Sequence, residues 1–225
     1  MKVWIVIFLS ALLLRVINIL FQNLDISQYI YEDQYLYWDW ASKGAYTTWS
    51  NIAPETLTER MPGIFWFYEM LMWVFGKSLF FILLTQGVLD SLTCVIMGKS
   101  AKLIEKDLES IVGFLAAISP TMIITSSQIL SDTLYLFFFS ISVYFFLKSY
   151  HEKFILSSII SGLMLGLSTL IRVSSYPLII LSVLVLFLTN FIKGRSKLKI
   201  VIAASLFFIF ALIPISSHLK NNIVN

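Results

Sequence analysis

Long apolar runs separated by short charged segments constrain the fold of this chain more than any other feature. The runs fall at about 3–21, 62–75, 78–98, 111–130, 133–147, 154–171, 174–192 and 200–217. Hydrophobic residues make up 58% of the 225 residues and charged residues only 13%, whereas soluble domains carry roughly 25% charged residues. Because so much apolar surface needs lipid as its solvent, the composition excludes a soluble enzyme, a disordered chain and a nucleic-acid-binding module.

The distribution of charge decides how many of these runs cross the membrane. Residues 64–75 give about 18 Å of helix at 1.5 Å per residue, which is shorter than a hydrocarbon core of about 30 Å. If this run does not cross, the N-terminus is cytoplasmic and the clusters Lys99–Lys106 and Lys193–Lys199 both lie inside, as short cytoplasmic loops prefer. The first run is expected to be an uncleaved span, because Arg15 interrupts it and no small-residue cleavage site follows.

The expected fold is therefore an all-α integral membrane protein with one membrane domain and seven transmembrane helices. The expected spans are 3–21, 78–98, 111–130, 133–147, 154–171, 174–192 and 200–217. The long first outer loop, 22–77, is predicted to contain interfacial helices at about 29–43 and 64–75, because it is rich in Tyr and Trp, which favour the headgroup layer. The predicted location is the cell (plasma) membrane, with the loop on the outer face.

Two ionisable residues lie deep in the expected spans, where charge is costly. Counted from opposite ends of their spans, Arg15 and Asp90 differ in depth by only about 6 Å. Asn18 and Gln22 share a helix face with Arg15, and Gln86 shares one with Asp90. We favour an ion pair that joins two helices over a catalytic role for these residues.

The outer loop contains a second group of ionisable residues. Glu32 and Asp33 are adjacent carboxylates, and Asp33, Tyr37 and Trp40 recur at helical spacing and share a face. A carboxylate in a half-dry interface can act as a general base. Taken alone the motif is weak, because acidic residues in an outer loop are more often simply solvated.

Three other charged residues are expected at the same depth. Arg60 precedes a Pro62-Gly63 turn, Arg172 follows the fifth expected span, and Asp132 lies in a tight outer turn. Arginines and carboxylates gathered at one level can hold a phosphate and deprotonate a nucleophile. Each arginine taken alone is better explained by contact with lipid headgroups.

The order of these features resembles the polyprenyl-phosphate-dependent GT-C glycosyltransferases, in particular the group that contains protein O-mannosyltransferases and the lipid A aminoarabinose transferase. The first outer loop of that family carries a D-E-x-x-Y-x-x-x-A pattern followed by G-x-Y. The corresponding residues here are Asp33, Gln34, Tyr37, Ala41, Gly44 and Tyr46. Gln34 departs from the acidic second position, and Glu32 lies on the other side of Asp33.

Later parts of the chain continue the resemblance. Glu59-Arg60-Met61-Pro62-Gly63 matches a basic-x-Pro turn, Phe75-Gly76 matches the end of an interfacial helix, and GLMLGLSTLIR, ending at Arg172, matches a G-x-x-x-G-L-x-x-L-x-R helix. Asp132 resembles the second outer acidic residue of the family. The family's P-W-x-x-R-N ending is degraded after Pro214.

The resemblance implies transfer of a sugar from a polyprenyl-phosphate donor to a glycan, lipid or protein acceptor on the outer face, with inversion. The site residues that it implies are Asp33 as general base with Glu32 and Asp132 beside it, Arg60 and Arg172 for the donor phosphate, and Tyr37, Trp40 and Glu59 around the sugar or acceptor. No cofactor is required by the motifs, and a divalent cation near Asp132 stays open.

Two alternatives accompany this hypothesis. A transporter or flippase of lipid or sugar would carry ionisable residues near mid-membrane, and only Arg15 and Asp90 lie there. Family members continue with further spans, so the chain is alternatively a truncated inactive product, or an accessory subunit that needs a partner chain for the C-terminal half. Neither alternative involves nucleic acid.

Overall fold

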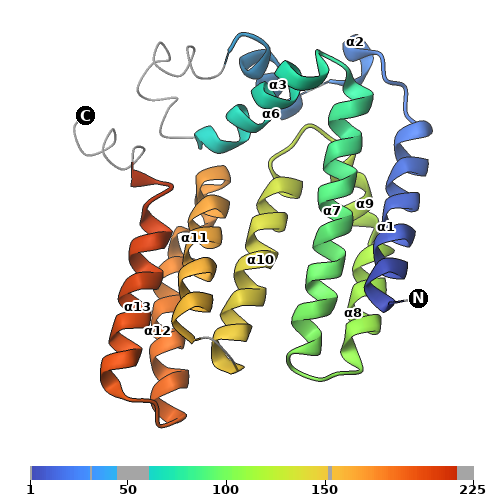
Figure 1. Cartoon of the computed structure of the whole chain (residues 1–225). Coiled ribbons are helices and arrows are strands. Elements are labelled where there is room, and N and C mark those ends of the chain that lie inside the picture. The colour runs from blue at the N-terminus through green and yellow to red at the C-terminus, as the bar shows by residue number, and fades with distance from the viewer. Residues whose placement is uncertain (1, 31, 45–60, 152–153, 217–225) are drawn as a thin grey trace. The chain divides into compact units, whose positions relative to one another are not determined.

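The computed structural model describes residues 2–30, 32–44, 61–151 and 154–216, and every regular element among them is a helix (Figure 1). This confirms the predicted all-α class. The chain divides into two compact units, Met1–Phe137 and Phe138–Asn225, with the boundary inside one long helix.

Several helices are long and apolar enough to cross a membrane. They are α1 (Val3–Leu20), α7 (Leu79–Lys102), Asp132–Tyr150 of α10 (Asp132–His151), α11 (Phe154–Ile171), and Val173–Ile192, which joins the 3-10 turn η1 (Val173–Ser175) to α12 (Tyr176–Ile192). Among the described residues, a bent pair, α8 (Leu108–Ala117) and α9 (Pro120–Ser126), brings the number of candidate spans from 5 to 6. The chain is thus a multi-pass membrane protein. The seventh span remains a prediction, since α13 (Lys197–Leu212) has 16 residues.

The run expected to form one span at 111–130 is broken in the middle. Helix α8 ends at Ala117 and α9 begins at Pro120, and the two axes differ by 53°. Ser119 is extended, with φ −61° and ψ 117°, as the residue before a proline prefers. Because Pro120 has no N–H to donate, it begins a helix more readily than it continues one.

The first unit is built around a buried ion pair between α1 and α7. Arg15 Nε donates to Asp90 Oδ2 at 2.7 Å, and the two side chains are 0% and 1% exposed, which confirms the predicted pair. The guanidinium also donates to the carbonyl oxygens of Ala116 and Ala117 at the end of α8. Arg15 therefore supplies a side-chain donor to both carbonyls at the break, and the Ala116 carbonyl also accepts the Ser119 N–H at 3.2 Å.

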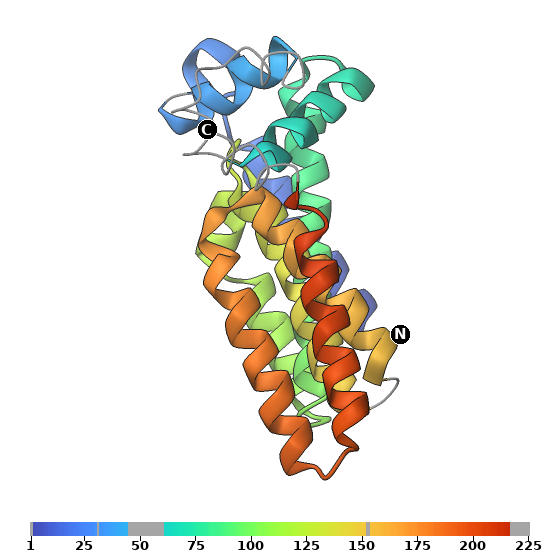
Figure 2. The ribbon, with the colours of Figure 1, turned by 90° about the vertical axis from the view of Figure 1, so that its left-hand side faces the viewer.

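The second unit is built on close contact between α11 and α13. A Cβ atom at Gly162 or Gly166 of α11 would collide with the backbone oxygens of Phe207 and Ala211 in α13. Small residues four positions apart allow such backbone contact in membrane helices. Helices α12 and α13 also pack together and join through a short connection (Figures 1 and 2).

We expect Gly166→Ala to lower stability by about 1–3 kcal/mol, the usual cost of overpacking. In an isolated helix the same change would stabilise the helix by about 1 kcal/mol. A loss of stability in the protein would therefore show that the added methyl group collides with the Ala211 carbonyl. Unfolding of the purified protein in mild detergent, followed against temperature, measures it. A higher melting temperature in the variant would contradict the close approach of α11 and α13.

Candidate active site

Two helices between α1 and α7 pack on each other through aromatic side chains. Helix α3 (Asp33–Ser42), preceded by the short α2 (Ile26–Tyr29), contacts α6 (Pro62–Phe75). Tyr37 is 6% exposed, and its ring centroid lies 5.4 Å from that of Phe65. Trp40 stacks on the same ring at 4.9 Å. Figure 1 shows α3 and α6 lying across the end of α7, the arrangement that an interfacial helix would need.

Asp33 is the first residue of α3, and its side chain is exposed. Glu32, which precedes it and is also exposed, has φ 49° and ψ −126° and is the one non-glycine residue with positive φ in the described part of the chain. A backbone in such a region costs on the order of 1–3 kcal/mol and is often found at functional sites. The start of a helix also favours a carboxylate through the positive end of the helix dipole.

The turn between α9 and α10, residues 127–131, leads directly into Asp132 and is fixed by side chains from α1 and α7. Asn18 of α1 and Gln22, just after the end of α1, each donate an amide hydrogen to Ser127 Oγ at 2.7 Å. Gln86 of α7 donates to the carbonyl oxygen of Gln128 at 3.0 Å. The polar faces expected on these two helices thus hold the residues just before Asp132.

Gln34 connects the start of α3 to the same turn. Its Oε1 accepts the backbone N–H of Ile129 at 3.0 Å, and its side chain is only 4% exposed. Gln34 follows Asp33 in the chain, and Ile129 lies three positions before Asp132. The hydrogen bond therefore brings the segments that carry the two predicted acidic residues to the same end of the first unit.

Tyr68 of α6 contributes a further contact to the turn. Its hydroxyl is fully buried and lies 2.8 Å from both the Leu130 carbonyl oxygen and Gln86 Oε1, two acceptors for its single proton. Burial above all, with Tyr37, Tyr29 and Asp132 nearby, raises the pKa of Tyr68 well above 10.0. The phenol thus stays neutral and remains a donor.

We expect Tyr68→Phe to lower the free energy of unfolding by about 1–3 kcal/mol, because buried acceptors lose their donor. The ring volume is unchanged, so the effect is that of the hydroxyl alone. Thermal unfolding in detergent measures it, and Tyr35→Phe, at an exposed position of α3, is the matched control. Equal melting temperatures for the Tyr68→Phe variant and the wild type would show that the turn does not depend on this hydroxyl.

A pocket of about 350 Å³ lies beside this network. The polar residues that line it are Gln22, Asn23, Tyr29, Gln34, Ser127 and Gln128. Amide and hydroxyl groups both donate and accept hydrogen bonds. A neutral lining of this kind suits a ligand rich in hydroxyl groups.

The remaining residues predicted for the site are Glu59, Arg60, Arg172 and Asp132. Glu59 and Arg60 fall outside the described residues. Arg172 belongs to the second unit, where it is exposed between α11 and η1, and its backbone N–H donates to the Ser168 carbonyl at 3.0 Å. Asp132 is half-buried. Within the described ranges, no group of three or more His, Cys, Asp or Glu side chains could hold a metal ion.

Sequence reasoning missed the positioning residues. Gln34 attracted attention only as a departure from an acidic motif position, yet its amide holds the turn before Asp132. The sequence placed Gln86 on a polar helix face but did not predict which groups it contacts. Tyr68 gave no signal, since a tyrosine in an aromatic-rich interfacial helix is expected for other reasons.

These features define a multi-pass membrane protein with carboxylates, amides and a polar pocket at one end of its first unit. A profile of the dolichyl-phosphate-mannose-protein mannosyltransferase family matches residues 59–219, and the chain belongs to this family. No curated protein and no solved structure matched the chain. The chain is therefore a membrane glycosyltransferase of the GT-C type, which confirms the resemblance found in the sequence. The match includes Asp132 and Arg172 and begins after α3.

Proposed function

We propose that this protein transfers a sugar from a polyprenyl-phosphate donor to an acceptor on the outer face of the plasma membrane, with inversion at the anomeric carbon. The observation that supports this most directly is the hydrogen bond from the Ile129 N–H to Gln34 Oε1 at 3.0 Å. It joins the helix that begins with Asp33 to the turn that ends at Asp132. The neutral pocket beside it would hold the hydroxyl groups of the sugar or the acceptor.

The chemistry assigned to Asp33 is general-base catalysis. Its exposed carboxylate takes the proton of an acceptor hydroxyl or amine as that atom attacks the anomeric carbon. The bond from this carbon to the phosphate oxygen breaks, and the lipid phosphate leaves with the bonding electrons. A single displacement of this kind inverts the configuration. Glu32 would modulate the charge beside the base, and Asp132 would orient the acceptor.

The aromatic residues of α3 would shape the site in different ways. Tyr37 is nearly fully buried against Phe65, so it acts by holding α3 on α6. Trp40 is half-buried and stacked on the same ring, which leaves part of its edge for a sugar. Glu59 stays a prediction for the same pocket.

Arg60 and Arg172 would neutralise the departing lipid phosphate. We expect Arg172→Ala and Arg60→Ala each to lower kcat/KM for the donor by roughly 10²-fold, as the loss of one preorganised donor does in other enzymes. Initial rates against donor concentration measure this. Lys106→Ala removes a positive charge from the connection between α7 and α8 and should leave the rate unchanged. Donor dependence identical to the wild type would remove either arginine from the site.

The function is tested by incubating the purified chain in lipid nanodiscs with a labelled polyprenyl-phosphate sugar and a panel of acceptors. We expect release of free polyprenyl phosphate together with labelled acceptor. Movement of the intact donor between leaflets of proteoliposomes, without cleavage, would instead identify a flippase. If the purified chain neither cleaves nor moves the donor, and a second chain restores cleavage, the protein is an accessory subunit.

A further inference from the structure

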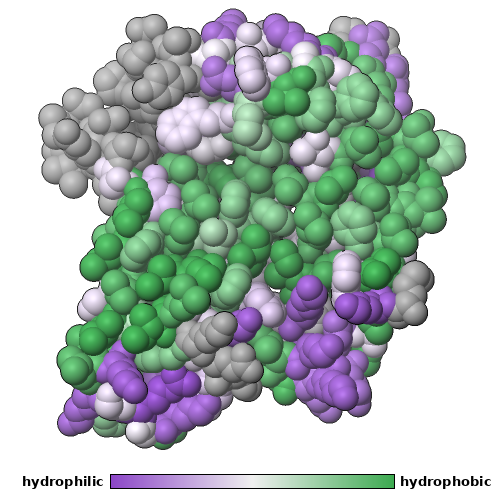
Figure 3. Space-filling model, viewed as in Figure 1, coloured by the Kyte–Doolittle hydropathy of each residue, from purple (hydrophilic) through white to green (hydrophobic). Residues whose placement is uncertain are grey.

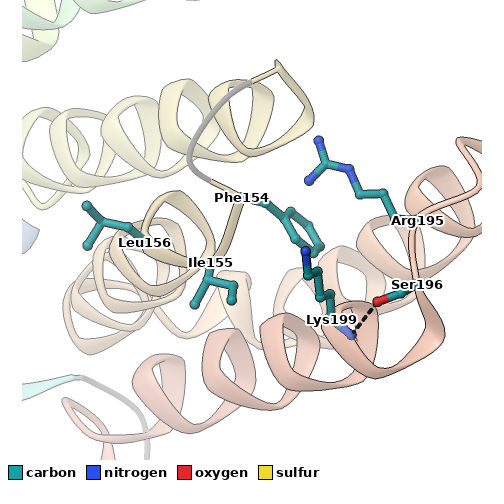
Figure 4. Close-up of a pocket in the computed structure, with 6 residues that line it drawn as sticks. All are labelled: Phe154, Ile155, Leu156, Arg195, Ser196 and Lys199. Carbon is teal, nitrogen blue, oxygen red and sulfur yellow. Dashed lines mark hydrogen bonds between the residues drawn. The ribbon is translucent and has the colours of Figure 1, made fainter.

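A pocket of about 550 Å³ lies in the second unit, where both α11 and α13 begin (Figure 4). One wall is apolar and consists of Phe154, Ile155 and Leu156 from the first turn of α11. The other wall comes from Arg195, Ser196 and Lys199 around the first turn of α13. The pocket thus combines a hydrocarbon surface with two cationic side chains.

The arginine of this pocket is held in place by neighbouring groups. The Arg195 guanidinium carbon lies 4.4 Å from the Phe154 ring centroid, and Nη2 donates to the Tyr150 carbonyl oxygen at 3.0 Å. Lys193 donates to the same oxygen at 2.7 Å. Figure 4 shows two side chains that extend towards Phe154, Lys199 from the first turn of α13 and Arg195 from the connection just before that helix. A fixed guanidinium keeps further N–H groups for an anion, since it has five donors.

The part of the chain around this pocket carries mostly positive charge. From residue 133 to the end, the sequence contains a single carboxylate side chain, Glu152, which lies outside the described residues. The connection between α12 and α13 and the first turn of α13 carry Lys193, Arg195, Lys197 and Lys199. Figure 3 shows this end of the second unit as a hydrophilic tip below a broad hydrophobic band. An anion that also presents hydrocarbon would complement both walls.

We propose that this pocket binds the headgroup phosphate of an anionic phospholipid, with the acyl chains along α11. Arg195 and Lys199 would hold the phosphate oxygens, and Ile155 and Leu156, which are 38% and 53% exposed, would contact the chains. Charge sorting predicts that this end faces the cytoplasm, the side where anionic lipids give a negative surface potential. Free phosphate has no hydrocarbon and would leave the apolar wall uncovered.

This lipid site is separate from the one proposed for the donor phosphate. The pocket lies at the N-terminal end of α11, whereas Arg172 follows its C-terminal end at Ile171. An 18-residue helix separates the two ends by about 27 Å at 1.5 Å per residue. The proposal therefore stands whether or not the chain transfers sugar, and one phosphate group cannot occupy both places.

The test compares lipid binding by two variants that remove equal charge from the same end of the unit. Arg195→Gln/Lys199→Gln changes the pocket, while Lys148→Gln/Lys197→Gln removes two charges that do not line it. Native mass spectrometry of detergent-solubilised protein titrated with dioleoyl-phosphatidylglycerol gives the bound fraction. We expect one saturable site in the wild type, about fivefold weaker binding for each pocket charge removed, and less than a twofold change in the control variant.

Three results would overturn the proposal. Equal losses in both double variants would mean diffuse attraction to a basic surface. Equal binding of dioleoyl-phosphatidylcholine would show that the anionic charge is not recognised. Displacement of the lipid by inorganic phosphate at comparable concentration would assign the pocket to a free anion. If the pocket variant fails to fold, Lys199→Gln alone, at an exposed position, gives the same comparison against Lys197→Gln.

Discussion

Replacing Asp33 with Asn is expected to lower sugar transfer by about 10²- to 10⁴-fold, the usual contribution of a general base. The amide has the shape of the carboxylate but cannot take the proton of the acceptor. Asp33 is exposed at the first position of α3, outside the aromatic contacts of Tyr37 and Trp40 with α6. Insertion and thermal stability should therefore stay close to those of the wild type.

The same helix supplies a matched control for this experiment. Asp39 is also a carboxylate of α3, and its Oδ2 lies 2.6 Å from Lys43 Nζ in a pair four residues apart. Asp39→Asn removes equal charge away from the start of the helix and should leave transfer unchanged. Glu32→Gln tests whether the neighbouring carboxylate shares the role. A fully active Asp33→Asn protein would contradict the proposed mechanism.

Replacing Arg15 with Met is expected to destabilise the first unit by about 3–5 kcal/mol, the cost of leaving one member of a buried ion pair without its partner. Asp90, which is 1% exposed, would be left in the interior of the first unit without its cationic partner. The carbonyl oxygens of Ala116 and Ala117 would lose a donor at the break between α8 and α9. Both effects lower the stability of the first unit.

A double-mutant cycle separates these two effects. Arg15→Met/Asp90→Leu removes both charges, so the part of the loss that comes from the unpaired carboxylate should disappear. What remains measures the contact of Arg15 with the α8 carbonyls. Unfolding in mixed detergent micelles, followed by circular dichroism, gives each free energy. Additive single-variant effects would mean that Arg15 and Asp90 are not coupled.

Features that follow from the periodicity of the chain could be predicted from the sequence. The helix expected at 64–75 is α6, Pro62–Phe75, because Pro62 favours a helix start and Gly76 with φ 64° favours its end. The Arg15–Asp90 pair was predicted because the rise per residue of a helix fixes the depth of each residue in its span. Neither inference needed knowledge of the neighbouring helices.

Features that depend on partners distant in the chain could not be predicted in this way. Gln34 and Ile129 are 95 positions apart, and Tyr68 and Leu130 are 62 apart. Nothing in the local sequence of either segment specifies the other. The break before Pro120 had a local signal, but the guanidinium that satisfies the carbonyls before it comes from α1.

The sequence by itself determined that this chain lies in a membrane, that its elements are helices, and which ionisable residues are buried. These properties follow from the cost of placing polar groups in lipid, which acts on each residue in turn. The tertiary structure alone decided how Asp33 and Asp132 come to one end of the first unit. That arrangement depends on a few buried hydrogen bonds, from Gln34, Gln86 and Tyr68, between segments that only folding brings together.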